Sequence, residues 1–273
     1  MKRRGVQVNA RRGYWSASEK ELTAAAKAAA TPVNVGLTTA LSGLSDSVNT
    51  RPVSIWTGFA KADAERTRVL FTWEPNPALT AAKPARLEIQ PVDEAGKATM
   101  PAQVIGGAPG ELPLVARFDL PGGRHRLRFT VLTTTGELMD RWVTAQPVPD
   151  FSRQSLVLST PLILRAKNMI ELRAIEANPS APATASTRFG PTDRLLVELD
   201  VQAPEGQTPQ LKVDLLNARG DLLRALETPP PVNGRSRMSL PVSSLANSTY
   251  VLRVEASAGD ETTEQWVAFR VAR

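Results

Sequence analysis

The second half of this 273-residue chain repeats the first half at a nearly constant spacing. The matched landmarks, at offsets of 124, 125 and 124 residues, are Leu87-x-Ile89…Gly96 with Leu211-x-Val213…Gly220, Leu120…His125-x-Leu127 with Leu245…Tyr250-x-Leu252, and Trp142-Val143 with Trp266-Val267. A shared offset over so many positions implies one fold used twice. We therefore expect the two halves to superpose, with Leu87 on Leu211, Gly96 on Gly220 and Trp142 on Trp266.

Apolar residues in both halves alternate with polar ones, which is typical of half-buried β-strands. The alternating sets are Val69, Phe71, Trp73; Leu87, Ile89; Leu114, Ala116, Phe118; Leu127, Phe129, Val131; Leu195, Val197, Leu199, Val201; Leu211, Val213, Leu215; Tyr250, Leu252, Val254; and Val267, Phe269, Val271. About seven short strands in each half predict an all-β chain of tandem immunoglobulin/fibronectin-III-like β-sandwiches. We place the first sandwich at 51–147 and the second at 153–273, with a linker at Gln146–Asp150.

The first 50 residues are patterned differently and predict an N-terminal strand remnant with a helical linker. The expected elements are a strand at Val6–Ala10, a helix at Leu22–Ala30 behind a capping-box pair (Ser18 and Glu21), and a short helix at Leu37–Leu44.

Charge and composition exclude several classes of function. The net charge is +6, but residues 1–12 hold five bases and no acid, so the two sandwiches are nearly neutral. Such a balance predicts no nucleic-acid partner. The chain has no cysteine, which excludes disulfides and thiolate metal sites. No apolar run is long enough to span a membrane, and no apolar stretch of a signal peptide follows Met1–Arg4.

His125 is the only histidine, and the repeat matches it to Tyr250. In Greek-key sandwiches a tyrosine near this position hydrogen-bonds the preceding loop and closes the corner between the sheets. We therefore expect Tyr250 to bond that loop and His125 to be structural rather than a catalytic base. We predict no catalytic residue, no cofactor and no metal site, and expect the chain not to be an enzyme.

Three arginines, Arg124, Arg126 and Arg128, alternate along the strand that begins at His125 and should share its outer face. They are candidates for binding an anion. The alternative is an ordinary basic stripe balanced by cross-strand acids such as Glu137 or Asp140.

Val143 and Val267 have the inward parity of their strands, so we expect their neighbours Trp142 and Trp266 to face outward or to cover a sheet edge. Both tryptophans are therefore candidate sugar-stacking platforms. Two short motifs have simpler explanations. Arg219–Asp221 matches the integrin-binding tripeptide, but the repeat makes Gly220 a hairpin glycine. Asn247–Thr249 matches a glycosylation sequon, and turn residues of these types are also common in loops.

The segment Lys2–Trp15, with its Arg-x-Gly-Tyr ending, resembles the end of the von Willebrand factor A-type domain in bacterial, acidobacterial-type VWFA-related proteins. The segments Gly122–Arg128 and Asp193–Val197 are similar to the β-rich region that follows in that family. The family's metal motif, Asp-x-Ser-x-Ser, has no match here, since Asp46–Thr50 carries Val at its third position. No metal site is carried over.

The resemblance implies the C-terminal β-rich part of such a protein, in an extracytoplasmic setting at the periplasm or cell surface. It also implies a role in assembly or adhesion, with a protein partner or the A domain itself. The sequence thus predicts a non-catalytic structural or protein-interaction module. One alternative is a carbohydrate-binding module, and another is a set of accessory domains of a glycoside-processing enzyme. Among enzymes, glycoside hydrolases stay open because they need only two carboxylates.

Overall fold

The structure is a computed structural model. It describes residues 34–45, 51–76, 83–108, 110–178, 180–240 and 242–272. Residues 36–273 form one compact unit, in which strands predominate. The strand and the first helix expected before residue 31, and the Asp46–Thr50 motif, lie outside the described residues.

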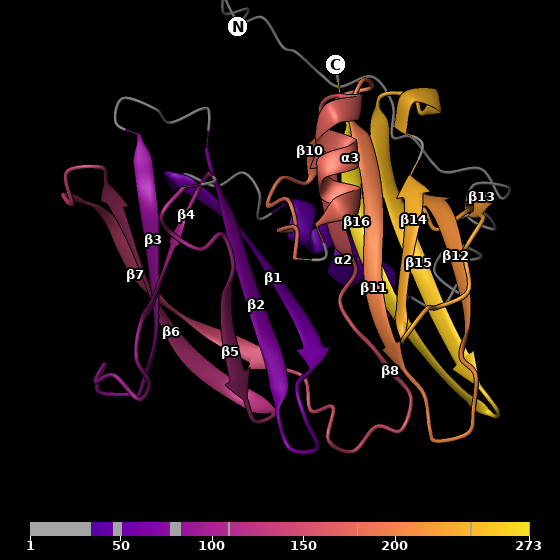
Figure 1. The fold of residues 1–273 in the computed structure, drawn as a ribbon, viewed down its shortest axis with the longest axis horizontal. Coiled ribbons are helices and arrows are strands. Elements are labelled where there is room, and N and C mark those ends of the chain that lie inside the picture. The colour runs from indigo at the N-terminus through magenta and orange to yellow at the C-terminus, as the bar shows by residue number, and fades with distance from the viewer. Residues whose placement is uncertain are drawn as a thin grey trace, which may run out of the picture. The chain divides into compact units, whose positions relative to one another are not determined.

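The first sandwich consists of two antiparallel sheets, coloured indigo to magenta in Figure 1. Its strands are β1 (Val53–Lys61), β2 (Thr67–Pro75), β3 (Pro84–Val92), β4 (Gln103–Gly106), β5 (Ala116–Leu120), β6 (Gly123–Thr133) and β7 (Leu138–Val148). One sheet has the order β1-β2-β5 and the other has the order β4-β3-β6-β7.

The second sandwich, coloured orange to yellow, uses the later strands (Figure 1). These are β8 (Val157–Leu158), β9 (Leu162–Ala166), β10 (Arg188–Phe189), β11 (Arg194–Gln202), β12 (Gln210–Asn217), β13 (Leu222–Leu226), β14 (Arg235–Leu240), β15 (Ser248–Ala258) and β16 (Glu261–Val271). Strands β8 and β9 pair with β11, which also pairs with β14, and the other sheet has the order β10-β16-β15-β12-β13.

The two halves share one strand order, as the repeat predicts. β4-β3-β6-β7 corresponds to β13-β12-β15-β16, and β1-β2-β5 corresponds to the sheet built around β11. The fourth strand pairs with the third rather than with the fifth, as in fibronectin-III-like domains. The chain is therefore an all-β tandem of fibronectin-III-like sandwiches, with β10 as an additional edge strand in the second copy.

The matched hairpins have the same geometry in both copies. The Gly96 N–H donates to the carbonyl of Asp93 at 3.0 Å, and the Gly220 N–H donates to the carbonyl of Asn217 at 3.0 Å. The φ angles are +79° at Gly96 and +88° at Gly220, a region that glycine enters without steric cost. The Arg219–Asp221 tripeptide is therefore part of a hairpin turn, as expected.

The inward-facing residues form one core per sandwich. Phe71 contacts the rings of Phe118 and Phe129 edge-on, with centroids 6.2 and 5.7 Å apart, a favoured aromatic geometry. In the second core, the ring centroids of Phe189 from β10 and Phe269 lie 6.0 Å apart. Most of the alternating residues are buried in these two clusters.

Two expectations about connecting segments were wrong. Gln146–Val148 is not linker but the end of β7, and Val148 is buried in the first core. The helix expected at Leu37–Leu44 is present as α2 (Val35–Ser45), but it packs on the β12–β15–β16 face instead of acting as a spacer.

A second helix, α3 (Met169–Ala177), was not predicted. Asn168 caps it by accepting hydrogen bonds from the backbone N–H groups of Ile170 and Glu171. Glu171 reaches back to the N–H of Lys167 at 2.8 Å. The spacing of Asn168 and Glu171 is a capping-box signal that sequence analysis had available.

Candidate interaction surfaces

The corner of each sandwich is closed by matched side chains. The Tyr250 hydroxyl donates to the carbonyl of Ala246 at 2.9 Å. The His125 Nε2 atom lies 2.8 Å from the carbonyl of Pro121, which is the corresponding residue of the first copy. The expected bond of Tyr250 to the preceding loop is confirmed, and His125 makes the matching contact with the carbonyl four residues earlier.

The arginine stripe lies on the outer face of β6. Arg124 and Arg126 are exposed, whereas Arg128 is half-buried and donates to the side chain of Gln90 and, at 3.3 Å, to the carbonyl of Gly96. Of the two acids named as cross-strand partners for the stripe, Asp140 is wrong, because it bonds Arg51 at 2.8 Å instead. Asp140 is opposite Val131 and so lies on the inner side of the sheet.

Trp142 faces inward, contrary to expectation. It pairs with Phe129 across β6 and β7, and their rings stack with centroids 5.1 Å apart. The guanidinium of Arg51 lies 4.2 Å from the Trp142 ring centroid. The indole is thus engaged by protein groups and does not present a flat sugar platform.

Trp266 faces outward, as expected, but α2 covers it. It pairs with Arg253 and packs with Leu37, Leu41 and the buried Leu44 of the helix. A Cβ atom on Gly36 would lie only 2.4 Å from the indole, so the helix backbone lies directly on the ring.

Trp142 and Trp266 are consequently not equivalent, and their expected superposition is wrong. Phe129 faces Trp142, whereas Val254, its counterpart, faces Gln265. The first hairpin is longer, with a register shift after Val131. Because strand side chains alternate, this one-residue slip places the two indoles on opposite faces.

The sandwiches are joined by buried and half-buried polar contacts on the outer face of β2. The Thr72 hydroxyl donates to the carbonyl of Ala183 at 2.9 Å, and these residues are 3% and 5% exposed. Glu74 accepts from the Thr184 hydroxyl, from the Ala185 N–H at 3.1 Å and from Arg165 at 3.4 Å.

A second set of contacts satisfies the open edge of β1. The Thr160 N–H donates to the carbonyl of Phe59 at 2.8 Å, and the Phe59 N–H donates to the Thr160 hydroxyl at 3.0 Å. One threonine therefore satisfies both backbone groups of an edge residue, which otherwise remain open to pairing.

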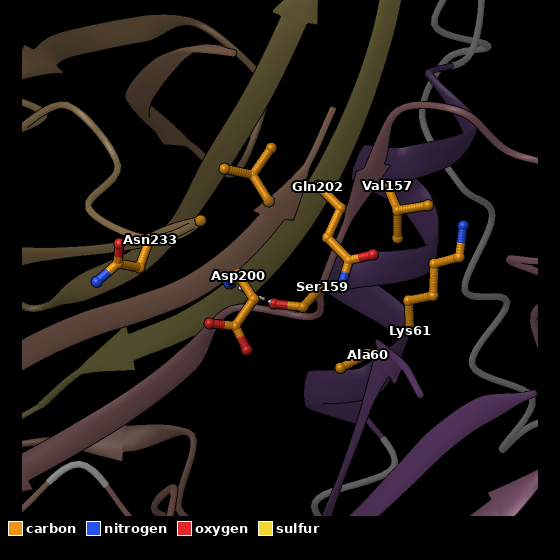
Figure 2. Close-up of a pocket in the computed structure, with 9 residues that line it drawn as sticks. Ala60, Lys61, Val157, Ser159, Asp200, Gln202 and Asn233 are labelled. Atoms are coloured by element: carbon orange, nitrogen blue, oxygen red, sulfur yellow. Dashed lines mark hydrogen bonds between the residues drawn. The ribbon is translucent and has the colours of Figure 1, made fainter. Parts of the chain in front are cut away.

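A small cavity lies beside this edge (Figure 2). Its volume is about 120 Å³, and its polar lining includes Lys61, Ser159, Asp200 and Asn233. The Asp200 N–H already donates to the Ser159 hydroxyl at 2.8 Å. Sites for drug-sized ligands occupy roughly 300–1,000 Å³, so this cavity suits a few water molecules.

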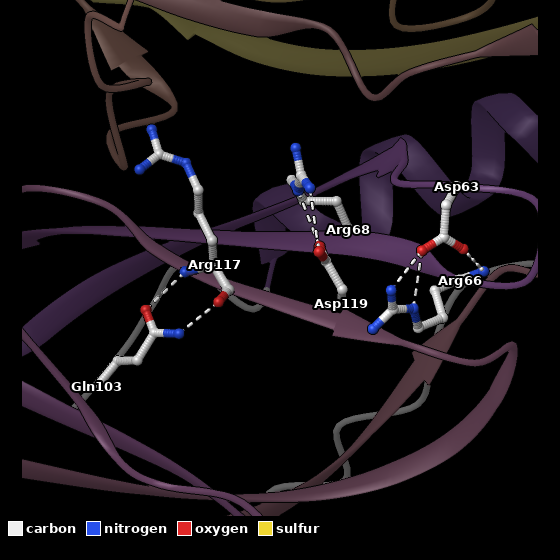
Figure 3. A network of polar contacts seen from close by, with 6 residues as sticks. All are labelled: Asp63, Arg66, Arg68, Gln103, Arg117 and Asp119. Carbon is white, nitrogen blue, oxygen red and sulfur yellow. Dashed lines mark hydrogen bonds and ion pairs between the residues drawn. The ribbon is translucent and has the colours of Figure 1, made fainter.

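Ion pairs stabilise this same end of the first sandwich, where Arg68 pairs across β1 and β2 with Ala60 of the cavity lining (Figure 3). Arg68 and Asp119 form a two-point pair at 2.8 and 3.0 Å, and the hydrogen bonds from Arg68 lower the pKa of Asp119. Hydrogen bonds from Arg66 likewise lower the pKa of Asp63. These carboxylates are held in their charged form, which suits surface pairing rather than proton transfer.

Figure 3 also shows a link between the two sheets of the first sandwich. The Gln103 side chain accepts from the N–H of Arg117 at 2.9 Å and donates to the carbonyl of the same residue. This contact satisfies the edge backbone of β5.

Within the described residues, no cluster of potential ligands could hold a metal ion. None of the helices in the described part of the chain is long and apolar enough to cross a membrane.

Comparison with protein families and with curated proteins finds no match. Among solved structures, the fibronectin(III)-like modules of Clostridium thermocellum CbhA are similar at 11% identity and a TM-score of 0.22, covering 76% of this chain and 87% of theirs. The β-glucuronidase of Parabacteroides merdae is similar at 10% identity and a TM-score of 0.25, covering 81% of this chain. That match spans only 25% of the glucuronidase. The fold assignment rests on the strand order of the chain itself.

Proposed function

We propose that this chain is a non-catalytic structural module whose two sandwiches act as one rigid body. The buried contact of Thr72 and the half-buried contacts of Glu74 with residues 183–185 carry the proposal. A hydrogen bond between buried groups fixes both partners, since leaving either one unsatisfied costs about 1–3 kcal/mol. Two sandwiches joined in this way hold their far ends at a set separation.

Two side chains of types that often act in catalysis are engaged in structural contacts here, which supports a structural role. His125 closes a corner, and Glu198 is paired with Arg237 and Arg235. The extracytoplasmic setting, the relation to VWFA-related proteins and a role in assembly or adhesion are part of the same proposal, and they rest on the resemblance of Lys2–Trp15. The contacts of Trp142 and Trp266 give no support to a carbohydrate-binding module.

Calorimetry of the double variant Thr72→Val, Glu74→Gln tests the rigid pair. The wild type should unfold in one transition, and the variant should separate into two, with a broader distribution of sizes in small-angle scattering. Glu88→Gln, on the opposite sheet, is the matched control and should leave one transition. Two transitions in the wild type, or one unchanged transition in the double variant, would contradict the proposal.

A further inference from the structure

The outer face of the β4-β3-β6-β7 sheet carries arginines with no partner in the described structure. Arg124, Arg126 and Arg141 are exposed, and their side chains make no hydrogen bond or ion pair with the described residues. Apart from His125, every basic residue on the four strands of this sheet is an arginine, and none is a lysine. The guanidinium binds carboxylates through two parallel hydrogen bonds, which lysine does not do.

The free arginines surround exposed apolar side chains. Strand pairing places Arg126 opposite Ala145 and Arg128 opposite Val143, and Arg141 is two residues from Val143 on the same face. Val143 is 43% exposed. Arg141 and Ala145 are four residues apart, which is about 13 Å along a strand. A partner that fits this face has carboxylates separated by an apolar contact.

The second copy shows how such a face is satisfied. Arg253, the counterpart of Arg128, is paired with the buried Asp214, and its guanidinium lies 5.8 Å from the ring centroid of Trp266, which α2 covers. In the first copy Gln90 occupies the place of Asp214. The carboxylate of Asp214 therefore has no counterpart beside Arg128, although Glu88 lies on the same face opposite Thr130. Neither helix of the described residues covers this face in the way that α2 covers the matched one.

We propose that the outer face of the β4-β3-β6-β7 sheet binds an acidic segment of a partner protein, with Arg124, Arg126 and Arg141 as the recognition residues. The mixture of arginine with exposed valine and alanine fits a protein partner better than a phosphate backbone, because interfaces between proteins combine arginine with apolar contacts. The proposal goes beyond the structural role argued above and does not depend on the rigidity of the pair.

Fluorescence anisotropy with a labelled 12-residue peptide of alternating Glu and Val is the test. We expect saturable binding that weakens when sodium chloride rises from 50 to 300 mM. The triple variant Arg124→Gln, Arg126→Gln, Arg141→Gln loses three exposed ion pairs with the peptide carboxylates. Its affinity for the peptide should be about tenfold weaker than that of the wild type. The triple variant with lysine at the same positions should have an intermediate affinity for the peptide, because it keeps the positive charges but loses the two-point hydrogen bonding of the guanidinium.

The matched control is Arg188→Gln, Arg219→Gln, Arg224→Gln, which removes three exposed arginines of the second sandwich and should bind the peptide as the wild type does. Equal loss in both triple variants would show nonspecific attraction and overturn the proposal. So would the absence of peptide binding at 50 mM salt, or tighter binding of a 20-nucleotide oligo-dT than of the peptide. Calorimetry of the same variants keeps the tests apart, since a failed rigid pair alters unfolding and a failed binding face alters only anisotropy.

Discussion

Replacing Tyr250 by Phe removes one hydroxyl and leaves the ring in place. The hydroxyl donates to the carbonyl of Ala246 at 2.9 Å, and Ala246 is exposed. Because water can replace the lost donor, the cost should be that of an ordinary hydrogen bond, about 0.5–1.5 kcal/mol, rather than that of a buried unsatisfied group.

Tyr250→Ala should cost far more, because the side chain is only 6% exposed and its ring stacks on Phe269 with centroids 5.7 Å apart. Deleting a buried aromatic ring leaves a cavity and costs roughly 3–5 kcal/mol. Losses of this size approach the whole stability of a small domain.

The first copy gives the matched experiment. His125→Phe removes the bond to the carbonyl of Pro121 and should cost about 0.5–1.5 kcal/mol, as Tyr250→Phe does. His125→Tyr restores the residue of the second copy and should retain or raise stability. Urea unfolding, with the free energy extrapolated to water and unchanged slopes, measures each variant. If both phenylalanine variants matched the wild type, or if His125→Tyr were as damaging as His125→Phe, the corner assignment would be refuted.

Two further predictions concern the covered face and an ion pair. Gly36→Ala should push α2 off Trp266, lower the free energy of unfolding by about 1–3 kcal/mol through overpacking and red-shift the tryptophan emission. The control is Gly43→Ala, where a Cβ atom meets nothing within 4 Å, and it should be neutral or stabilising. Equal emission spectra for both variants would contradict the docking of the helix. Since Arg68 lowers the pKa of Asp119 in the folded state, their pair stabilises fully above the unfolded pKa of about 3.9, and this stabilisation is lost as the pH falls through the folded pKa. Asp119→Asn should therefore be about 0.5 kcal/mol less stable than the wild type at pH 7, and the difference should shrink as the pH falls below the unfolded pKa. A difference independent of pH in urea unfolding would disprove the effect.

Local patterns were sufficient where the governing physics is local. The alternation of Val69, Phe71 and Trp73 marks one buried face, and all three are in the core. Gly96 and Gly220 have positive φ because their hairpins require it. Tyr250 and His125 bond carbonyls only four residues away, so the spacing of the motif already contains the contact.

No local sequence pattern predicted the contacts between the two sandwiches. Thr72 and Glu74 alternate with the core residues of β2 and have the pattern of a solvent-facing row. Their burial depends on a segment more than 100 residues later in the chain. Likewise, α2 was predicted as a helix, but its place on Trp266 follows from the fold of the second sandwich.

The two copies differ most in what covers them. In the second copy β10 pairs with the edge of β16, where the Arg270 N–H donates to the carbonyl of Thr187 at 2.8 Å. Strand pairing makes Pro147 the counterpart of Arg270, and proline has no N–H to donate. The edge of β7 is thus blocked against the same strand addition. A partner of the first copy can therefore bind the exposed arginine face but cannot add a strand to β7 at Pro147. Substitution of the outward-facing arginines should thus weaken binding.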